Sequence, residues 1–245
     1  MSGGKNRTDE LWPGGPRFLK GGAFSLGTDS VLLADFASGA GAKRVCDLGC
    51  GSGILSVLVA WNDPAVTLVD GVEIQKQAAA AASVNVEMNR LSSRVRITAG
   101  DLREYRELFD AGDYDMVVSN PPYFPSGSGY ASEDEAAAVA RDERSCTLAD
   151  VCGAAAYLTR WGGRFCLVHR PERLSEVFCA LTAAGLEPKR LRLVQHRADA
   201  APNLALIEAR RGGRPGLEIK APLLMTDETG GDSPEIRRIY HRSEQ

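Results

Sequence analysis

The chain has 245 residues, of which 44% are hydrophobic and 25% charged, and its formal net charge is −3. This balance excludes a mainly disordered or collagen-like chain, because such sequences are poorer in apolar residues or far more biased. The longest apolar runs fall well short of the roughly 20 residues that a membrane-spanning helix needs, and no apolar stretch follows Met1. The sequence therefore predicts a cytoplasmic protein without membrane segments.

The six cysteines and three histidines carry no metal or disulfide pattern. The cysteine spacings match neither zinc pairs nor a dense disulfide framework, and His169, His196 and His241 lack metal-ligand spacing. We therefore expect reduced thiols and no metal.

The predicted elements follow one another as strands and helices. Residues 1–22 are rich in Gly, Pro and charge and are predicted to be a mobile lead-in. Thr28 or Asp29 could cap a helix through Val31–Phe36. Strands are predicted over 44–48, 66–74, 95–98, 114–119, 164–168, 190–195 and 204–209. Helices are predicted over 53–61, 75–91, 133–141, 148–161 and 171–184.

Alternation of this kind indicates an α/β fold with a mostly parallel sheet covered by helices on both faces. The last two strands have no helix between them, which predicts antiparallel pairing at a sheet edge. With no internal repeat and no convincing linker, residues 23–245 are predicted to form a single domain.

A glycine-rich turn stands between the first strand and the first helix of the alternation. Residues 47–53 read Asp-Leu-Gly-Cys-Gly-Ser-Gly, and glycines there permit a sharp turn and close approach of a ligand to the backbone. A dinucleotide fingerprint would require Gly or Ala at Ile54. A purely structural turn is the alternative.

Two acids follow the next two strands. Glu73 lies about 20 residues beyond the turn, where a carboxylate accepts ribose hydroxyls. Asp101 follows the third strand, where it could accept from the amine of an adenine. Each acid could instead be a solvated loop end or a helix cap.

Together these residues resemble the class I S-adenosylmethionine-dependent methyltransferases. The resemblance implies a Rossmann-like, seven-stranded, mostly parallel sheet whose last strand is antiparallel, with S-adenosyl-L-methionine as cofactor. It also implies a set of cofactor-binding residues: Asp47, Gly49, Gly51, Gly53, Glu73 and Asp101.

The fourth strand runs directly into Asn120-Pro121-Pro122-Tyr123. A planar amino nitrogen is a poor nucleophile, and the Asn oxygen and Pro carbonyl can accept its hydrogens while the Tyr ring stacks on its plane. A Pro-Pro turn capped by Asn is the structural alternative. The tetrad resembles that of methyltransferases acting on adenine N6, cytosine N4 or glutamine N5. That likeness implies that these four residues are catalytic and that Asn120 borders the cofactor.

The segment before the core limits which molecule can be the methyl acceptor. Only 44 residues precede Val45, fewer than the helical substrate domain of release-factor glutamine methyltransferases requires. Phe24–Leu33 instead resembles the corresponding segment of the bacterial tRNA (adenine-37-N6)-methyltransferase family, which modifies the anticodon loop of a valine tRNA. The resemblance places Thr28 near the cofactor and Asp29 near the target, although a helix cap explains both almost as well. Residues 212–217 and Tyr240 extend it towards the C-terminus.

An RNA acceptor requires stacking and cationic contacts. Tyr123 or Phe124 could stack on the base, and Arg141 could clamp a phosphate or pair with Glu143. Residues 160–245 carry 15 basic against 11 acidic residues, net +4, and the remainder is net −7. Six basic residues could contact phosphates or form a charge-balanced surface: Arg210, Arg211, Arg214, Lys220, Arg237 and Arg238.

Three alternatives stay open: ribosomal RNA or DNA as the acceptor, a protein glutamine, or an inactive cofactor-binding scaffold. The complete Asn120 tetrad and glycine turn argue against the scaffold. The sequence does not indicate an oligomeric state.

Overall fold

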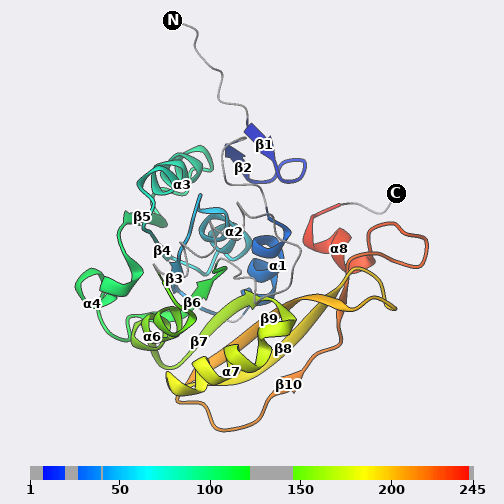
Figure 1. Cartoon of the computed structure of the whole chain (residues 1–245). Coiled ribbons are helices and arrows are strands. Elements are labelled where there is room, and N and C mark those ends of the chain that lie inside the picture. The colour runs from blue at the N-terminus through cyan, green and yellow to red at the C-terminus, as the bar shows by residue number, and fades with distance from the viewer. Residues whose placement is uncertain (1–7, 20–26, 40, 122–145, 243–245) are drawn as a thin grey trace, which may run out of the picture.

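The computed structural model describes residues 8–19, 27–39, 41–121 and 146–242 (Figure 1). The predicted helix over 133–141 lies outside these residues. In the first part the elements are β1 (Thr8–Glu10), β2 (Arg17–Leu19), α1 (Thr28–Ala37), β3 (Arg44–Leu48), α2 (Ile54–Asn62), β4 (Leu68–Glu73), α3 (Lys76–Met88), β5 (Val95–Ala99), η1 (Leu102–Glu104), α4 (Tyr105–Leu108) and β6 (Tyr114–Ser119). They continue with α6 (Leu148–Leu158), β7 (Thr159–His169), η2 (Pro171–Arg173), α7 (Leu174–Ala183), β8 (Leu186–Gln195), β9 (Pro202–Arg211), β10 (Glu218–Ile219), β11 (Leu223–Leu224) and α8 (Pro234–Ile239).

One sheet organises the molecule. Its seven long strands lie in the order β5-β4-β3-β6-β7-β9-β8. Neighbours from β5 to β7 pair in parallel, whereas β9 is antiparallel to both β7 and β8. The predicted Rossmann-like sheet with an antiparallel last strand is thus confirmed. Two further strands, β10 and β11, each only two residues long, extend it by pairing with β8.

Successive side chains of each strand belong to two hydrophobic cores, one on each face of the sheet. Val45 and Val118 belong to the core that includes side chains of α1 and α2, whereas Cys46 and Val117 belong to the core formed with α6 and α7. Successive side chains of a strand point to opposite faces, so each buried strand must be apolar on both sides. Helices cover both faces of the sheet, as predicted (Figure 1).

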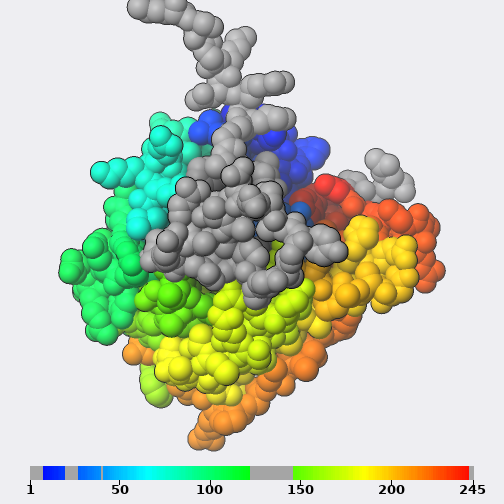
Figure 2. Space-filling view, in the orientation of Figure 1, coloured from blue at the N-terminus to red at the C-terminus, as the bar shows by residue number. Residues whose placement is uncertain are grey.

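Residues 8–19, within the predicted lead-in over 1–22, form a hairpin that the sequence analysis did not predict. Thr8 pairs with Leu19 and Glu10 with Arg17. Phe18 is 1% exposed and joins Trp12 in the core that includes α1 and α2. Strands of three residues are too short to display a period of two. In Figure 2 this blue hairpin lies close to the red C-terminal segment, where the ring of Trp12 lies 4.5 Å from that of His241.

The helix predicted over 148–161 ends earlier, at Leu158. The Thr159 hydroxyl donates to the Ala155 carbonyl at 2.7 Å, and Thr159 already pairs with Tyr114 of β6. Gly162 and Gly163, which follow the predicted helix, lie inside β7, beside a register shift in its pairing with β6. A Cβ on Gly163 would lie 2.8 Å from the Asp115 carbonyl oxygen, so this glycine permits close strand approach at an irregularity.

Candidate cofactor and amine-binding site

The predicted site residues follow consecutive parallel strands. The glycine turn follows β3, Glu73 ends β4, Asp101 follows β5 and Asn120 follows β6. Because the carboxyl ends of parallel strands meet at one edge, these residues lie along the edge where α/β proteins bind ligands. The Ser119 hydroxyl donates to the Leu48 carbonyl at 2.8 Å, which ties the end of β6 to the end of β3.

The glycine turn is folded against β4. The backbone N–H groups of Gly49 and Cys50 both donate to the Val72 carbonyl at 3.0 Å. Gly49, Gly51 and Gly53 have φ values of 71°, 54° and 77°, which L-residues with side chains rarely adopt. A Cβ on Gly53 would lie 2.9 Å from that of Ala82, whereas one on Gly49 or Gly51 would meet no described atom within 4 Å. The first two glycines therefore leave an open approach to the backbone.

Glu73 joins this turn to the following helix. Its carboxylate accepts from the Gly51 N–H at 2.9 Å and from the Gln75 N–H at 2.8 Å, and the side chain is 8% exposed. Each carboxylate oxygen can accept more than one hydrogen bond. Glu73 therefore retains acceptor capacity for ribose hydroxyls while it holds the turn in place.

Asp47 lies below the turn and is 1% exposed. One carboxylate oxygen accepts from the Ser56 hydroxyl at 2.6 Å, and its Oδ1 has no hydrogen-bond partner among the described groups. Burial raises the pKa of Asp47 to about 7, against the lowering effect of the Ser56 hydrogen bond. A buried oxygen without a donor is costly. Together with the open backbone at Gly49 and Gly51, it fits a site that a polar cofactor completes.

The two cysteines of the first strand and turn are poor nucleophiles. Burial is the main cause that raises the pKa of Cys46 and Cys50, and nearby Asp47 adds to it in both cases. A thiol reacts as its thiolate, so a raised pKa makes both unreactive.

Asp101 is the N-cap residue of the short helix η1. Its carboxylate accepts from the Arg103 backbone N–H at 2.9 Å and binds the Arg103 guanidinium, which lowers the pKa of Asp101. The contact of Asp101 with adenine stays a prediction. Arg103 was not a predicted site residue, although an Arg two positions after an Asp at a helix start is the local signal that could have found it.

Asn120 meets helix α1. Its Nδ2 donates to the Ser30 Oγ at 3.0 Å, and Ser30 is 8% exposed. Pro121 is also buried. The other members of the predicted amine and substrate site lie outside the described residues: Pro122, Tyr123, Phe124 and Arg141.

Thr28 and Asp29 begin α1 and do not cap it. The N-cap is Gly27, without a side-chain capping bond, so the capping alternative for both residues is wrong. Thr28 hydrogen-bonds to Tyr240, whose pKa is raised mainly by burial. Asp29 lies in the first turn, directly before Ser30. Their roles towards cofactor and target stay predictions.

Asn85 on α3 is a supporting residue that the sequence did not single out. Its Nδ2 donates to the Ser52 carbonyl at 2.9 Å, and its Oδ1 accepts from the Leu19 N–H at 2.9 Å. Asn89, one turn later, accepts from and donates to the backbone of Arg17. Two asparagines four residues apart on one helix face are the signal that could have revealed them. Asn85 thereby links the hairpin to the glycine turn.

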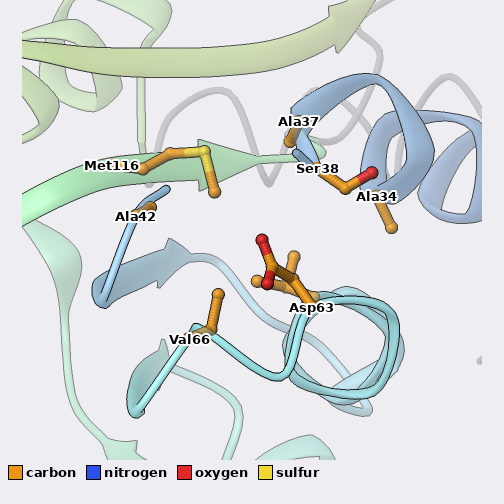
Figure 3. A pocket seen from close by; sticks show the side chains of 8 residues that line it. Ala34, Ala37, Ser38, Ala42, Asp63, Val66 and Met116 are labelled. Carbon is orange, nitrogen blue, oxygen red and sulfur yellow. The ribbon is translucent and has the colours of Figure 1, made fainter. Parts of the chain in front are cut away.

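A hollow at the opposite edge of the sheet is not part of this site (Figure 3). It is lined by residues from the starts of strands and the ends of helices: Ala34, Ala37, Ser38, Ala42, Val59, Asp63, Val66 and Met116. Arg210 and Arg211 end the antiparallel strand β9 and therefore lie at this same edge, away from Asn120.

Four of the six basic residues proposed for phosphate contact have partners. Arg211 donates to the carbonyls of Tyr157 and Thr159, and Lys220 pairs with Glu218. The other two also pair with acids: Arg237 with Asp227, and Arg238 with Asp35. For the three that pair with acids, the structure favours a charge-balanced surface, whereas Arg211 is bonded to neutral carbonyls.

In the described part of the chain, no three acids, cysteines or histidines come together as a metal site. No helix in the described ranges is long and apolar enough to cross a membrane.

Solved structures share the fold. The structure resembles that of a predicted O-methyltransferase from Agrobacterium tumefaciens with a TM-score of 0.69 and 22% identity, covering 89% of this chain and 98% of that one. A geranyl diphosphate C-methyltransferase from Streptomyces coelicolor A3(2), solved with Mg²⁺, geranyl diphosphate and S-adenosyl-L-homocysteine, matches with a TM-score of 0.53 and 16% identity. That match covers 74% of this chain and 76% of the other.

Sequence relatives identify the family. The model for the methyltransferase small domain matches residues 21–142. A tRNA1(Val) (adenine(37)-N6)-methyltransferase from Tolumonas auensis is 31% identical over 87% of both chains. One from Yersinia pseudotuberculosis is 37% identical over 159 residues. The matched region covers 65% of this chain and 62% of that relative. Together with the glycine turn, Glu73 and Asn120 at one sheet edge, these matches show that the chain belongs to the tRNA1(Val) (adenine(37)-N6)-methyltransferase family.

Proposed function

We propose that the chain transfers a methyl group from S-adenosyl-L-methionine to the exocyclic N6 of adenine 37 in the anticodon loop of a valine tRNA. The observation that carries this proposal is the position of Asn120, which directly follows a strand tied to the glycine turn and donates to Ser30 of α1. The acceptor is inferred from the names of the relatives. A tRNA acceptor and six free cysteines support a cytoplasmic location.

Different residues along the sheet edge would bind the cofactor and the acceptor amine. Glu73 and the open backbone of Gly49 and Gly51 would hold the cofactor, which supplies an electrophilic methyl group on sulfonium. Asn120 Oδ1 and the Pro121 carbonyl would accept the two N6 hydrogens and favour a pyramidal nitrogen. So held, the amine would present its lone pair in line with the methyl group that the cofactor supplies, and the proton lost on transfer would pass to solvent. Tyr123 is proposed to stack on the adenine.

The test is nucleoside mass spectrometry of purified valine tRNA from cells that lack the gene. N6-methyladenosine should be lost from position 37, return with the wild-type gene and stay absent with Asn120→Ala. Asn203→Ala, which changes an exposed asparagine on β9, is the matched control and should restore the modification. Unchanged N6-methyladenosine in the deletion strain would refute the tRNA acceptor.

A further inference from the structure

We propose that Arg103 masks Asp101 in the free protein and is displaced by the adenine amine when the cofactor binds, so that Arg103 sets cofactor affinity and base specificity. The inference rests on the proposed function and concerns its cofactor site alone. The Gly100 N–H donates to the Glu73 carbonyl at 3.0 Å, so the residues that follow β5 lie directly beside the acid expected to bind the ribose. The Arg103 guanidinium lies on the Asp101 carboxylate and therefore beside the same site.

The two acids of the cofactor site differ in how many acceptor sites they have left. Each carboxylate oxygen of Glu73 accepts one backbone N–H, from Gly51 or from Gln75. On Asp101, Oδ1 accepts from the backbone N–H and the Nε–H of Arg103 at 2.9 and 3.0 Å, and Oδ2 accepts from the Nε–H at 2.9 Å and from Nη2. A carboxylate has about four lone-pair sites. Arg103 therefore fills the acceptor sites of Asp101, and an adenine amine can bond there only after the guanidinium leaves.

The ion pair can open at its guanidinium end without disturbing the carboxylate. The Arg103 side chain is 45% exposed and that of Asp101 is 17% exposed, so the guanidinium is the more accessible partner. Among the described residues, the Arg103 side chain hydrogen-bonds to Asp101 alone. When it leaves, the Arg103 backbone N–H still holds Asp101 Oδ1 in position. An exposed ion pair contributes little to stability, so its exchange for another donor is a small step.

The exchange favours one kind of base. The exocyclic amine of adenine is a donor and can replace the donors of Arg103 on the carboxylate. A 6-oxo purine presents an oxygen at that position, and two acceptors do not bond, so Arg103 would stay on Asp101. Competition with Arg103 therefore lowers the affinity for adenosyl ligands, whereas a 6-oxo analogue gains nothing from its removal.

The binding test is calorimetry with S-adenosylhomocysteine and with its 6-oxo analogue, S-inosylhomocysteine. Arg103→Ala should bind S-adenosylhomocysteine about twofold to fivefold more tightly than the wild type, the range expected for release of an exposed ion pair. The difference should shrink as NaCl rises from about 0.02 to 0.5 M, because salt weakens the pair in the wild type. Arg103→Ala should not tighten the binding of S-inosylhomocysteine. Equal or weaker binding of S-adenosylhomocysteine by Arg103→Ala would overturn the proposal.

Two controls separate this exchange from a general effect of charge. Arg106→Ala removes the same charge three positions later, where the guanidinium carbon lies 5.2 Å from the centre of the Tyr105 ring and 4.7 Å from that of Tyr157. It should keep the wild-type affinity. In an Asp101→Asn background, Arg103→Ala should no longer tighten binding, because there is no carboxylate to unmask. A gain in affinity from Arg106→Ala, or from Arg103→Ala without the Asp101 carboxylate, would also contradict the exchange.

A direct measurement follows the guanidinium itself. The Arg103 Nε–H signal of ¹⁵N-labelled protein, identified by its absence in Arg103→Ala, should be shifted downfield and slow to exchange in the free protein. Saturation with S-adenosylhomocysteine should move it to the position of an exposed arginine, and S-inosylhomocysteine should not. A signal that stays bonded in the saturated protein refutes the displacement.

The same spectrum separates failure of this inference from failure of the proposed function. If S-adenosylhomocysteine does not bind the wild type, the cofactor site is misplaced and the exchange falls with it. If it binds but no tRNA is methylated, only the acceptor is wrong, and the response of the Arg103 signal still decides whether the guanidinium is displaced.

Discussion

Burial at the site changes the pKa of the Asp47 carboxylate and therefore the pH dependence of stability. It lies at the end of β3 with a pKa raised to about 7 by burial, and one oxygen bonded to Ser56. Between roughly pH 4 and 7 the folded chain holds a proton there that the unfolded chain has released. This group therefore stabilises the fold fully below pH 4, and its contribution is lost as the pH rises through 7.

The first prediction concerns Asp47→Asn, a neutral side chain of the same shape. The unfolding free energy of the wild type, relative to the variant, should fall by up to about 1.4 kcal/mol per pH unit between pH 4 and 7. Urea unfolding without cofactor at several pH values measures it. Asp101→Asn is a control of opposite sign, because the wild-type Asp101 pKa is lowered by Arg103 and its contribution is lost as the pH falls through that pKa. A constant difference between wild type and Asp47→Asn would contradict the assignment.

Which site residues could be predicted depends on where their partners lie. Asp47, Glu73 and Asn120 could be identified because each lies at or directly after the end of a strand, and the parallel order brings these strand ends together. Ser30 could not be assigned as a partner in the same way, because it reaches Asn120 from a helix 90 positions away. Arg103 stands two positions after Asp101 at a helix start, a local signal that could have identified this partner of Asp101.

At the scale of the element, the three glycines of one turn do different things. All three have positive φ, but only Gly53 is in close contact with the neighbouring helix, through Ala82 of α3. The sequence predicted the turn and its place between β3 and α2. It could not distinguish the glycines, because their roles depend on what lies opposite each one.

The second prediction separates these roles. Gly53→Ala should lower the melting temperature more than Gly51→Ala, since it adds an overlap with Ala82 to the backbone strain of about 1–2 kcal/mol that both variants carry. Gly51→Ala should weaken binding of S-adenosylhomocysteine roughly tenfold or more, because its Cβ enters the open approach to the turn. Calorimetry and thermal unfolding report the two effects. Equal losses of stability, with unchanged affinity for Gly51→Ala, would show that the cofactor lies elsewhere.

The end of α6 shows why element boundaries were harder to predict. Residues 159–161 were included in the predicted helix because the next two residues, both glycines, are a normal helix stop. In the fold, pairing of Thr159 with Tyr114 takes these residues into β7 instead. A partner strand 45 positions earlier decided the boundary, and local pattern carries no information about it.

For the whole molecule, Asn85 is the connection between the N-terminal hairpin and the cofactor edge. The third prediction is that Asn85→Ala weakens S-adenosylhomocysteine binding and costs about 2 kcal/mol of stability, because it leaves the Ser52 carbonyl, which is buried, and the Leu19 N–H, which is partly buried, without this partner. Asn89→Ala is the matched control. It releases the exposed Arg17 backbone and a side-chain bond to the Asn85 carbonyl, which still accepts from the Asn89 N–H, and it should leave the affinity unchanged. Equal affinities in Asn85→Ala and the wild type would show that the hairpin is independent of the turn.

Helix α1 is synthesised long before several of the residues that hold it in place. Its contacts include Arg190, Arg238 and Tyr240, which leave the ribosome long after residues 28–37. Helix α1 therefore gains these supports only after residues 190–240 have been made. A chain that ended before Arg190 would carry the glycine turn and Asn120 without any of these three contacts of α1.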